Sequence, residues 1–391
     1  MKISELVQEL VNSAERGASI ARAIRAESEL LDLLVQEKKG EQKNPRFVQD
    51  FKTLADVLVQ EMMKYELSKR FPGIGENIYG EESNKFTNIL GETVTVQIFP
   101  DHRQTAELLC KVLDGNEKAA KLLTSELYRD IVIDPGPELQ MLGDLQVDVN
   151  DIGVWIDPID STAQYIDGLD GAVSDSVMVQ NGLQCVVVLV GVYLKSSGLP
   201  IMGVANRPFT RLENSQWQGE SMWGVSFNQT RVFSIQTHEK EAGKVAKETN
   251  NDVKKLSVLM SQSELQIIQE LFGRYMGIRH AAGAGYKLLG VIQGHCDAYV
   301  LSKGSTFKWD TCGPHAILLA LGGGIISFKF LEDAFSKIAD SSMKYQLKYN
   351  APDNESLTGG AKWSNSQGLV AYRSLAELKQ VIDIYQTTPT N

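Results

Sequence analysis

The sequence predicts an α/β protein, with an α+β sheet domain followed by an α/β domain. A largely helical start gives way to apolar runs with the spacing of strands over residues 154–233, and from about residue 256 strands alternate with helices. Such alternation is typical of a sheet covered by helices. Because 391 residues are enough for about two or three domains, we expect one domain over residues 1–237 and another over residues 238–391.

The first domain is expected to begin with two helices. Apolar residues recur at helical spacing over residues 3–38, with a break near Gly17, and a second helix is predicted over residues 51–70, ending before Pro72. Residues 84–132 mix a short alternating stretch with a helical one. We expect this segment to be an insertion or a side lobe.

The strands of the first domain are predicted from six apolar runs. Asn181-Gly182 lies between two of them, and this dipeptide favours a tight hairpin turn. In order, the runs are GVWID, DSVMVQNG, CVVVLVGVYL, PIMGVANRPF, SMWGVSF and TRVFSIQ.

The second domain is expected to follow a charged, solvated connection over residues 238–255. Residues 340–366 are rich in Asn, Ser, Gly and Lys and are predicted to form a long loop. The predicted strands are LSVLMS, DAYVL and GGGIISF, and the predicted helices span residues 264–276, 285–293, 312–321 and 374–385.

Composition and charge exclude several classes of protein. The hydrophobic content of 43% and charged content of 23% are those of a soluble globular protein, the start is polar, and the longest apolar stretch is too short to span a bilayer. The net charge of −10 argues against nucleic acid as a partner, though not against a small phosphorylated substrate. We expect small-molecule partners, no membrane and no nucleic acid, and a monomer. Four widely spaced cysteines without a CxxC pair predict a reducing, cytoplasmic compartment.

The stretch GVWIDPIDSTAQYIDG, residues 153–168, carries the strongest chemical signal. Pro158 denies a backbone N–H and fixes φ, so the chain is expected to turn there. A turn would direct the carbonyl of Ile159 toward the carboxylates of Asp157 and Asp160. Hard oxygen donors of this kind suit Mg²⁺.

The two residues that follow Asp160 predict a phosphate-binding site. Ser161 and Thr162 can start a helix whose N-terminal N–H groups attract an anion. An EF-hand is excluded, because Ile159 stands where an acid or Asn is needed and Thr162 where Gly is needed. A strand end followed by a capped helix remains the structural alternative.

Other acids are ambiguous when taken alone. Asp56, within an apolar helix, is either exposed or buried with a partner; Glu81-Glu82 can be a solvated turn, and Asp310 a helix cap. HExxH, P-loop and GxSxG motifs are absent, and the five histidines are scattered.

Together these segments resemble a known family. WIDPIDST and, much later, WDTCGPHAILLALGGG resemble the two signatures of the inositol monophosphatase superfamily, whose members are lithium-sensitive, magnesium-dependent phosphatases. KTLADVLVQ, IYGEE and GAGYKLLGVIQGHCDAYV fit in the right order. The resemblance covers most of the chain apart from residues 84–130 and 340–366. It implies a layered αβαβα fold with the metal site in the cleft between the domains.

The resemblance also implies a metal centre of two or three Mg²⁺ ions, with Li⁺ as an inhibitor at one of the positions. Thr162, paired with Asp56, would position and deprotonate the attacking water, with Glu81 as a further catalytic residue. Direct attack by water is expected, because no Cys or His nucleophile lies in a suitable motif. The implied metal ligands are Glu81, Glu82, Asp157, the carbonyl of Ile159, Asp160 and Asp310.

Substrate binding is implied for residues of both domains. Lys287 could instead be a solvent-facing helix residue, since its motif is short. The full set is Asp160, Ser161, Thr162, Ser261, Ser263, Gly283, Ala284, Lys287 and Ser305.

Two features point to a subgroup of the family. Ser161 stands where most members have Gly, and the chain is longer than a monophosphatase. Both favour members that remove the 1-phosphate from inositol 1,4-bisphosphate and inositol 1,3,4-trisphosphate. A 3′(2′),5′-bisphosphate nucleotidase and a catalytically dead inositol-phosphate-binding protein remain as alternatives.

Overall fold

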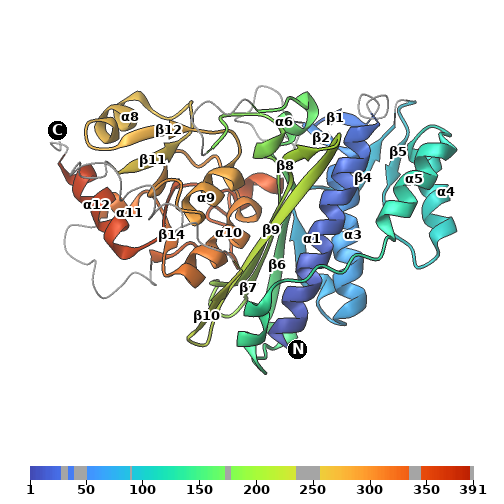
Figure 1. The fold of residues 1–391 in the computed structure, drawn as a ribbon, viewed down its shortest axis with the longest axis horizontal. Helices are drawn as coiled ribbons and strands as arrows, with labels where there is room; N and C mark the ends of the chain where they lie inside the picture. Colours follow the sequence, from blue (N-terminus) through green and yellow to red (C-terminus); the bar gives the residue numbers. More distant parts are fainter. Residues whose placement is uncertain are drawn as a thin grey trace.

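Five layers of secondary structure make up the molecule, in the order helix, sheet, helix, sheet, helix (Figure 1). The predicted α/β class and the layered αβαβα order are therefore confirmed. The computed structural model describes residues 1–27, 34–38, 51–88, 90–171, 178–234, 256–333 and 345–387.

The first sheet has six strands in the order β10-β9-β8-β7-β6-β3, and only the β3–β6 pair is parallel. All residues of β6 are buried, because helices cover both faces of the sheet. The strands are β3 (Ile78–Gly80), β6 (Ile152–Asp160), β7 (Val187–Leu194), β8 (Pro200–Glu213), β9 (Gln216–Phe227) and β10 (Thr230–Phe233).

Helices α1 (Ile3–Ala26) and α3 (Leu54–Arg70) cover the outer face of this sheet. The predicted break near Gly17 is wrong, because α1 runs through it without interruption. A Cβ on Gly17 would lie 2.8 Å from Val59 Cγ1, so this glycine lets α1 and α3 pack closely. The predicted helix over residues 3–38 is too long: residues 28–33 lie outside the described residues, and Val35–Glu37 form strand β1, which pairs with β2 (Phe51–Thr53).

The segment over residues 84–132 lies at one side of the molecule, as expected for a side lobe (Figure 1). It contains two helices rather than one, and the chain changes direction between them at Asp114 and Gly115, which both have positive φ. Its elements are β4 (Lys85–Thr87), β5 (Thr93–Thr95), α4 (His102–Val112) and α5 (Glu117–Leu127).

The hairpin predicted at Asn181-Gly182 is wrong. Residues 178–182 form no strand, and the short 3₁₀ helix η5 (Leu183–Cys185) follows directly. The rest of the predicted run, residues 175–177, lies outside the described residues. Ahead of it, α6 (Thr162–Asp167) follows β6. Further 3₁₀ helices are η2 (Gly75–Asn77), η3 (Pro137–Leu142) and η4 (Val149–Asp151).

The second sheet has five strands in the order β12-β11-β13-β15-β14. Two of them, β12 and β15, were not expected from the sequence, and the predicted connection over residues 238–255 lies outside the described residues. Part of the predicted loop over residues 340–366 contains the 3₁₀ helix η7 (Gly359–Trp363). The elements are β11 (Ser257–Met260), α8 (Gln266–Gly273), β12 (Gly277–His280), α9 (Ala284–Ile292), β13 (Ala298–Leu301), α10 (Lys308–Leu321), β14 (Gly324–Ile326), α11 (Phe330–Asp333), β15 (Leu369–Tyr372) and α12 (Leu375–Gln386).

Helix α10 lies between the two sheets and contacts both. Three glycines allow it to approach the first sheet: Gly191, Gly203 and Gly224 are paired side by side on β7, β8 and β9. A Cβ on Gly203 would overlap the backbone of Gly313 in α10, and one on Gly224 would lie 2.8 Å from Cα of Ile317. Because α10 belongs to the cores of both halves, the two-domain division stays a prediction.

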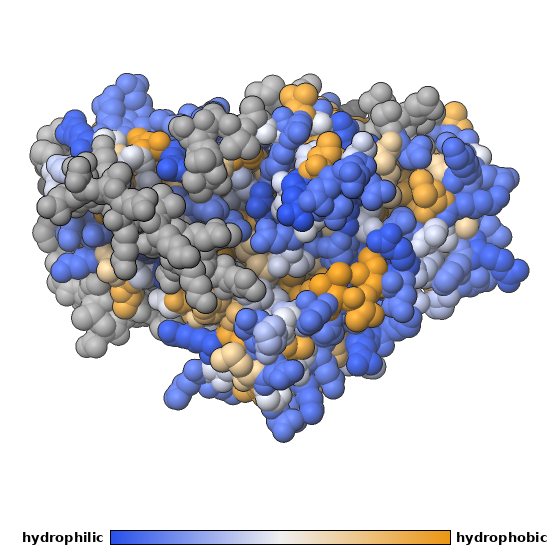
Figure 2. Space-filling model, viewed as in Figure 1, coloured by the Kyte–Doolittle hydropathy of each residue, from blue (hydrophilic) through white to orange (hydrophobic). Residues whose placement is uncertain are grey.

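The face of the molecule in Figure 2 is mostly hydrophilic, with apolar groups in small areas. In the described part of the chain, no helix combines the length and apolar character that crossing a membrane requires.

Candidate active site

A cavity of about 1420 Å³ lies between the two halves of the molecule. Segments from α6, α9 and α10 and from the ends of β3, β6, β11 and β13 reach its walls. All of the predicted site residues except Asp56 line it. They are Glu81, Glu82, Asp157, Ile159, Asp160, Ser161, Thr162, Ser261, Ser263, Gly283, Ala284, Lys287, Ser305 and Asp310.

A β-bulge at the end of β6 brings two of the acids together. Asp157 pairs with Leu189 and Asp160 with Val187, so Pro158 and Ile159 stand opposite a single residue of β7. Residues three apart in a regular strand face opposite sides, and the extra residue of the bulge reverses this. The chain does not turn at Pro158 as predicted; the strand continues to Asp160, and the bulge directs both carboxylates to one side.

Asp310, in the first turn of α10, completes an acidic cluster with this pair. Asp157, Asp160 and Asp310 are all buried, and one carboxylate oxygen from each lies within 4.8 Å of the others. Hydrogen bonds fix two of them: the N–H of Gly285 donates to Asp160 Oδ2 (2.9 Å), and the N–H of Phe307 to Asp310 Oδ2 (2.8 Å). Asp157 Oδ1 is buried and has no hydrogen-bond partner among the described residues.

The environment of the acidic cluster disfavours the ionised form of its carboxyl groups. Burial, followed by the charges of Glu81, Asp160 and Asp310, raises the pKa of Asp157 well above its usual value. Burial likewise raises the pKa of Asp310 strongly and that of Asp160 to about 6. Buried carboxylates so close together need a cation to remain ionised. The three acids and the unpartnered oxygen of Asp157 therefore fit a divalent metal ion, which binds oxygen ligands.

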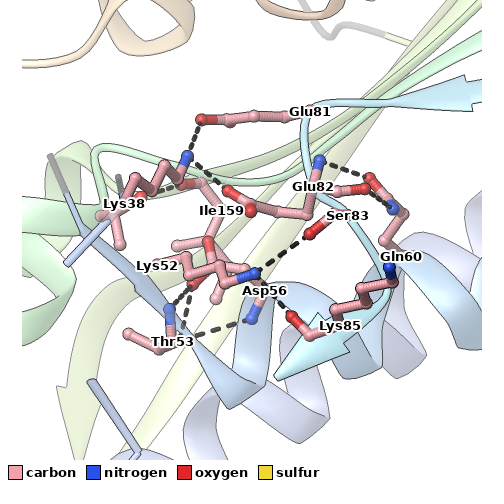
Figure 3. A network of polar contacts seen from close by, with 11 residues as sticks. Lys38, Lys52, Thr53, Asp56, Gln60, Glu81, Glu82, Ser83, Lys85 and Ile159 are labelled. Atoms are coloured by element: carbon pink, nitrogen blue, oxygen red, sulfur yellow. Dashed lines mark hydrogen bonds and ion pairs between the residues drawn. The ribbon is translucent and has the colours of Figure 1, made fainter. Parts of the chain in front are cut away.

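Glu81 and Glu82 reach the cavity from the end of β3, and a lysine that the sequence did not single out lies between them (Figure 3). Lys38 Nζ is 2.6 Å from Glu81 Oε1 and 2.5 Å from Glu82 Oε1. Lys38 is one of several lysines in a charged stretch, and nothing in the local pattern distinguishes it. Only the fold shows that this cation faces two predicted metal ligands.

The backbone of Glu82 is held by Gln60 of α3. The N–H of Glu82 donates to Gln60 Oε1 (2.9 Å), and Gln60 Nε2 donates to the Glu82 carbonyl (2.6 Å) (Figure 3). Burial raises the pKa of Glu82 to about 8, although the charge of Lys38 opposes this. Gln60, fully buried, was also missed in the sequence, where it reads as an ordinary helix residue.

The predicted contact between Asp56 and Thr162 is not formed in this structure. Asp56 Oδ2 accepts from the N–H and the hydroxyl of Thr53 (both 2.6 Å), in a capping box that begins α3, and the Thr162 hydroxyl donates to the Ile159 carbonyl (3.1 Å). Asp56 is nevertheless fully buried, as the resemblance implied, and burial raises its pKa to about 6. Its second oxygen, Oδ1, finds no hydrogen bond among the residues that the structure describes. Its charge also reaches α6, where it contributes to raising the pKa of Tyr165 after the larger effect of burial.

Ser161 adopts a backbone conformation that favours glycine. It lies between β6 and α6 with φ 74° and ψ 45°, in the left-handed region. Glycine, which the resemblance implies at this position, would adopt this conformation without strain. A Cβ on Gly283 would overlap the Ser161 hydroxyl, so the loop that begins α9 packs directly on this residue.

Polar groups predicted to bind substrate gather at the end of β11 and the start of α9. The hydroxyls of Ser261 and Ser263 are 3.0 Å apart. Lys287 is buried rather than solvent-facing: its ammonium donates to the carbonyls of Ala281 (3.0 Å) and Gly283 (2.6 Å), and burial lowers its pKa to about 8. Lys287 therefore fixes the loop that carries the predicted substrate contacts.

A model of the inositol monophosphatase family matches residues 7–337 of this chain. Among curated proteins, the inositol polyphosphate 1-phosphatase of Mus musculus is 42% identical over 380 residues, which cover 95% of this chain and 94% of the mouse protein. The 3′(2′),5′-bisphosphate nucleotidase 1 of Mus musculus is 26% identical over 325 residues, which cover 82% of each protein.

A solved structure shows the same fold. The extragenic suppressor protein suhB from Bartonella henselae matches with a TM-score of 0.52 over 98% of each chain, at 13% sequence identity.

Proposed function

This chain belongs to the inositol monophosphatase family and is a phosphoric monoester hydrolase, and from this we propose that it removes the 1-phosphate from inositol 1,4-bisphosphate and inositol 1,3,4-trisphosphate. The observation that carries the proposal is the 42% identity to a protein named inositol polyphosphate 1-phosphatase over nearly the full length of both chains. The nucleotidase alternative has less support, at 26% identity over 82%. A catalytically dead protein would be expected to lack a metal ligand, whereas every predicted ligand lines the cavity.

Mg²⁺ is the proposed cofactor, with Li⁺ as an inhibitor. Asp157, Asp160 and Asp310 would hold the metal in the acidic cluster, and Glu81, Glu82 and the Ile159 carbonyl would supply further oxygen ligands. When bound, such ions polarise the phosphoryl group and lower the pKa of coordinated water.

The residues of the chain have their own proposed tasks. The N–H groups at the start of α6, including those of Ser161 and Thr162, would bind the phosphate that is cleaved. The Thr162 hydroxyl, on the cavity surface, would orient the attacking water. Asp56 would act on that hydroxyl with Oδ1, the buried oxygen that its capping bonds leave without a partner.

The proposed location is a reducing compartment, the cytoplasm. No disulfide joins the four cysteines, all of which lie in the described residues, and three of them are buried. Cysteines without disulfides are usual in such a compartment.

Phosphate release with Mg²⁺ tests the proposed substrate. We expect kcat/KM for inositol 1,4-bisphosphate to exceed that for adenosine 3′,5′-bisphosphate by more than tenfold, because only the former carries a phosphate on the 1-position of an inositol ring. Asp157→Asn, which removes a proposed ligand, serves as the inactive control against contaminating phosphatases. Equal or faster hydrolysis of the nucleotide would assign the chain to the nucleotidases.

A further inference from the structure

One side of the cavity is formed by residues 303–307 and 359–363, which we call the lysine wall. The two segments are joined through Asn365, which is fully buried. Its N–H donates to the Thr306 carbonyl (2.7 Å), and its side-chain amide donates to the Thr306 hydroxyl (3.1 Å). The wall is thus one unit, although its segments are more than fifty residues apart in sequence.

The wall is tied to the helix that carries a proposed metal ligand. The hydroxyl of Thr311 in α10 donates to the Phe307 carbonyl (3.0 Å), and the rings of Phe307 and Trp309 stack with their centroids 4.7 Å apart. The N–H of Phe307 also donates to Asp310, as described above. These contacts hold the wall in a fixed place relative to the acidic cluster.

Among the described residues, four lysines line the cavity, and two of them already face carboxylates. Lys38 is paired with Glu81 and Glu82. Lys287 is buried, donates to two loop carbonyls and faces the charge of Asp160. Both cations therefore already face carboxylates, and Lys287 keeps one donor for the substrate contact that the resemblance implies.

The other two lysines, Lys303 and Lys362, both belong to the lysine wall. The ammonium of Lys303 donates to the carbonyl of Ser263, and the N–H of Ser305 donates to the Lys303 carbonyl (2.8 Å). Lys362 Nζ lies 5.1 Å from the ring centroid of the neighbouring Trp363. Neither lysine forms an ion pair within the described part of the chain, and both are half-buried.

We infer that Lys303 and Lys362 bind the phosphate that is not cleaved, so that the lysine wall selects inositol polyphosphates over monophosphates. The inference rests on the proposed function. A phosphate monoester carries nearly two negative charges at neutral pH, and lysine binds it as a point charge. The scissile phosphate goes to the acidic cluster and its metal ions, and in a 1,4-bisphosphate the other phosphate lies across the ring. The wall offers the cations that this second phosphate requires.

Inhibition by the product isolates this contact, because inositol 4-phosphate carries only the phosphate that stays. In Lys303→Met and Lys362→Met, we expect the inhibition constant of inositol 4-phosphate and the KM of inositol 1,4-bisphosphate to rise roughly tenfold each, with kcat changed less than twofold. Inhibition by inorganic phosphate, which occupies the scissile site, should be unchanged. The Lys→Arg variants should recover most of the affinity, which a merely structural role would not predict.

Lys118→Met, at an exposed position of α5, is the matched control and should leave every constant unchanged. The inference is overturned if wild-type enzyme hydrolyses inositol 1,4-bisphosphate while the double variant Lys303→Met/Lys362→Met, folded by its unfolding midpoint, keeps wild-type inhibition by inositol 4-phosphate. Absence of phosphate release by wild type from any inositol phosphate would instead reject the proposed function.

Discussion

At the scale of single residues, Asp56 shows what sequence patterns can and cannot predict. From its position in an apolar helix, Asp56 could be either exposed or buried, and the resemblance implied that it is buried. The structure confirms the burial, but the hydrogen bonds of Asp56 are with Thr53 and not with Thr162. The local sequence could have revealed the capping box, since Thr53 and Asp56 have the required spacing. It could not show the second, unpartnered oxygen, which depends on how α3 packs.

A double-mutant cycle tests whether Asp56 and Thr162 act together. Asp56→Asn keeps an oxygen that can cap α3 and removes the carboxylate. We expect Asp56→Asn and Thr162→Ala each to lower kcat by roughly 10²–10⁴ with little change in KM, because positioned base catalysis is lost while substrate contacts remain. The double variant should be hardly slower than either single one. Losses that multiply would leave Asp56 with the capping role alone.

At the scale of elements, the sequence predicted most strands and helices but not the features that place the site on them. The run from Gly153 to Asp160 was predicted to be a strand that turns at Pro158. The bulge depends on the register between β6 and β7, which no single segment contains. Likewise, Gly191, Gly203 and Gly224 become neighbours only when β7, β8 and β9 pair, and together they let α10 pack closely on the sheet.

Gly203→Ala tests the role of this close approach. The added methyl group would overlap the backbone of Gly313, so α10 must move or the sheet must distort. We expect the free energy of unfolding to fall by about 1–3 kcal/mol, and metal affinity to fall with it, because α10 carries Asp310. Urea unfolding and calorimetric titration with Mg²⁺ measure the two effects.

Gly277→Ala is the matched control, since its Cβ would meet only the Leu256 carbonyl at 3.7 Å. It should have little effect on either quantity. If Gly203→Ala is as mild as this control, the close approach of α10 does not depend on the glycines.

At the scale of the whole molecule, two motifs more than a hundred residues apart were enough to predict the fold and the family. The motifs did not predict the roles of Lys38, Gln60 or the lysine wall, because these contacts form between segments that are far apart in the sequence. Residues 340–366 illustrate this: the sequence predicted only a long loop, whereas part of the segment lines the cavity.

A buried histidine gives the folded molecule a pH dependence. His315 of α10 is fully buried; its Nδ1 lies 2.9 Å from the Tyr349 hydroxyl and its Nε2 2.7 Å from Gln346 Oε1. Burial lowers its pKa from 6.5 to about 3. Below pH 6.5 the unfolded chain therefore binds a proton that the folded protein does not, and stability is lost as the pH falls.

We expect this residue to remove about 2 kcal/mol from the free energy of unfolding between pH 7.5 and pH 5, at about 1.4 kcal/mol per pH unit below 6.5. Urea unfolding of wild type and of His315→Gln measures it. The buried acids titrate in both proteins, so the difference between the two pH profiles isolates His315. Parallel profiles would show that the histidine is not neutral in the folded state.

Whether the acidic cluster serves a metal-dependent 1-phosphatase is measured by ³¹P NMR of inositol 1,4-bisphosphate during its reaction with the enzyme. With Mg²⁺ present, we expect the 1-phosphate resonance to disappear as inorganic phosphate grows and the 4-phosphate resonance to persist as inositol 4-phosphate. Chelation should stop the reaction. Release of the 4-phosphate, or an undiminished rate after exhaustive chelation, would contradict the proposed function.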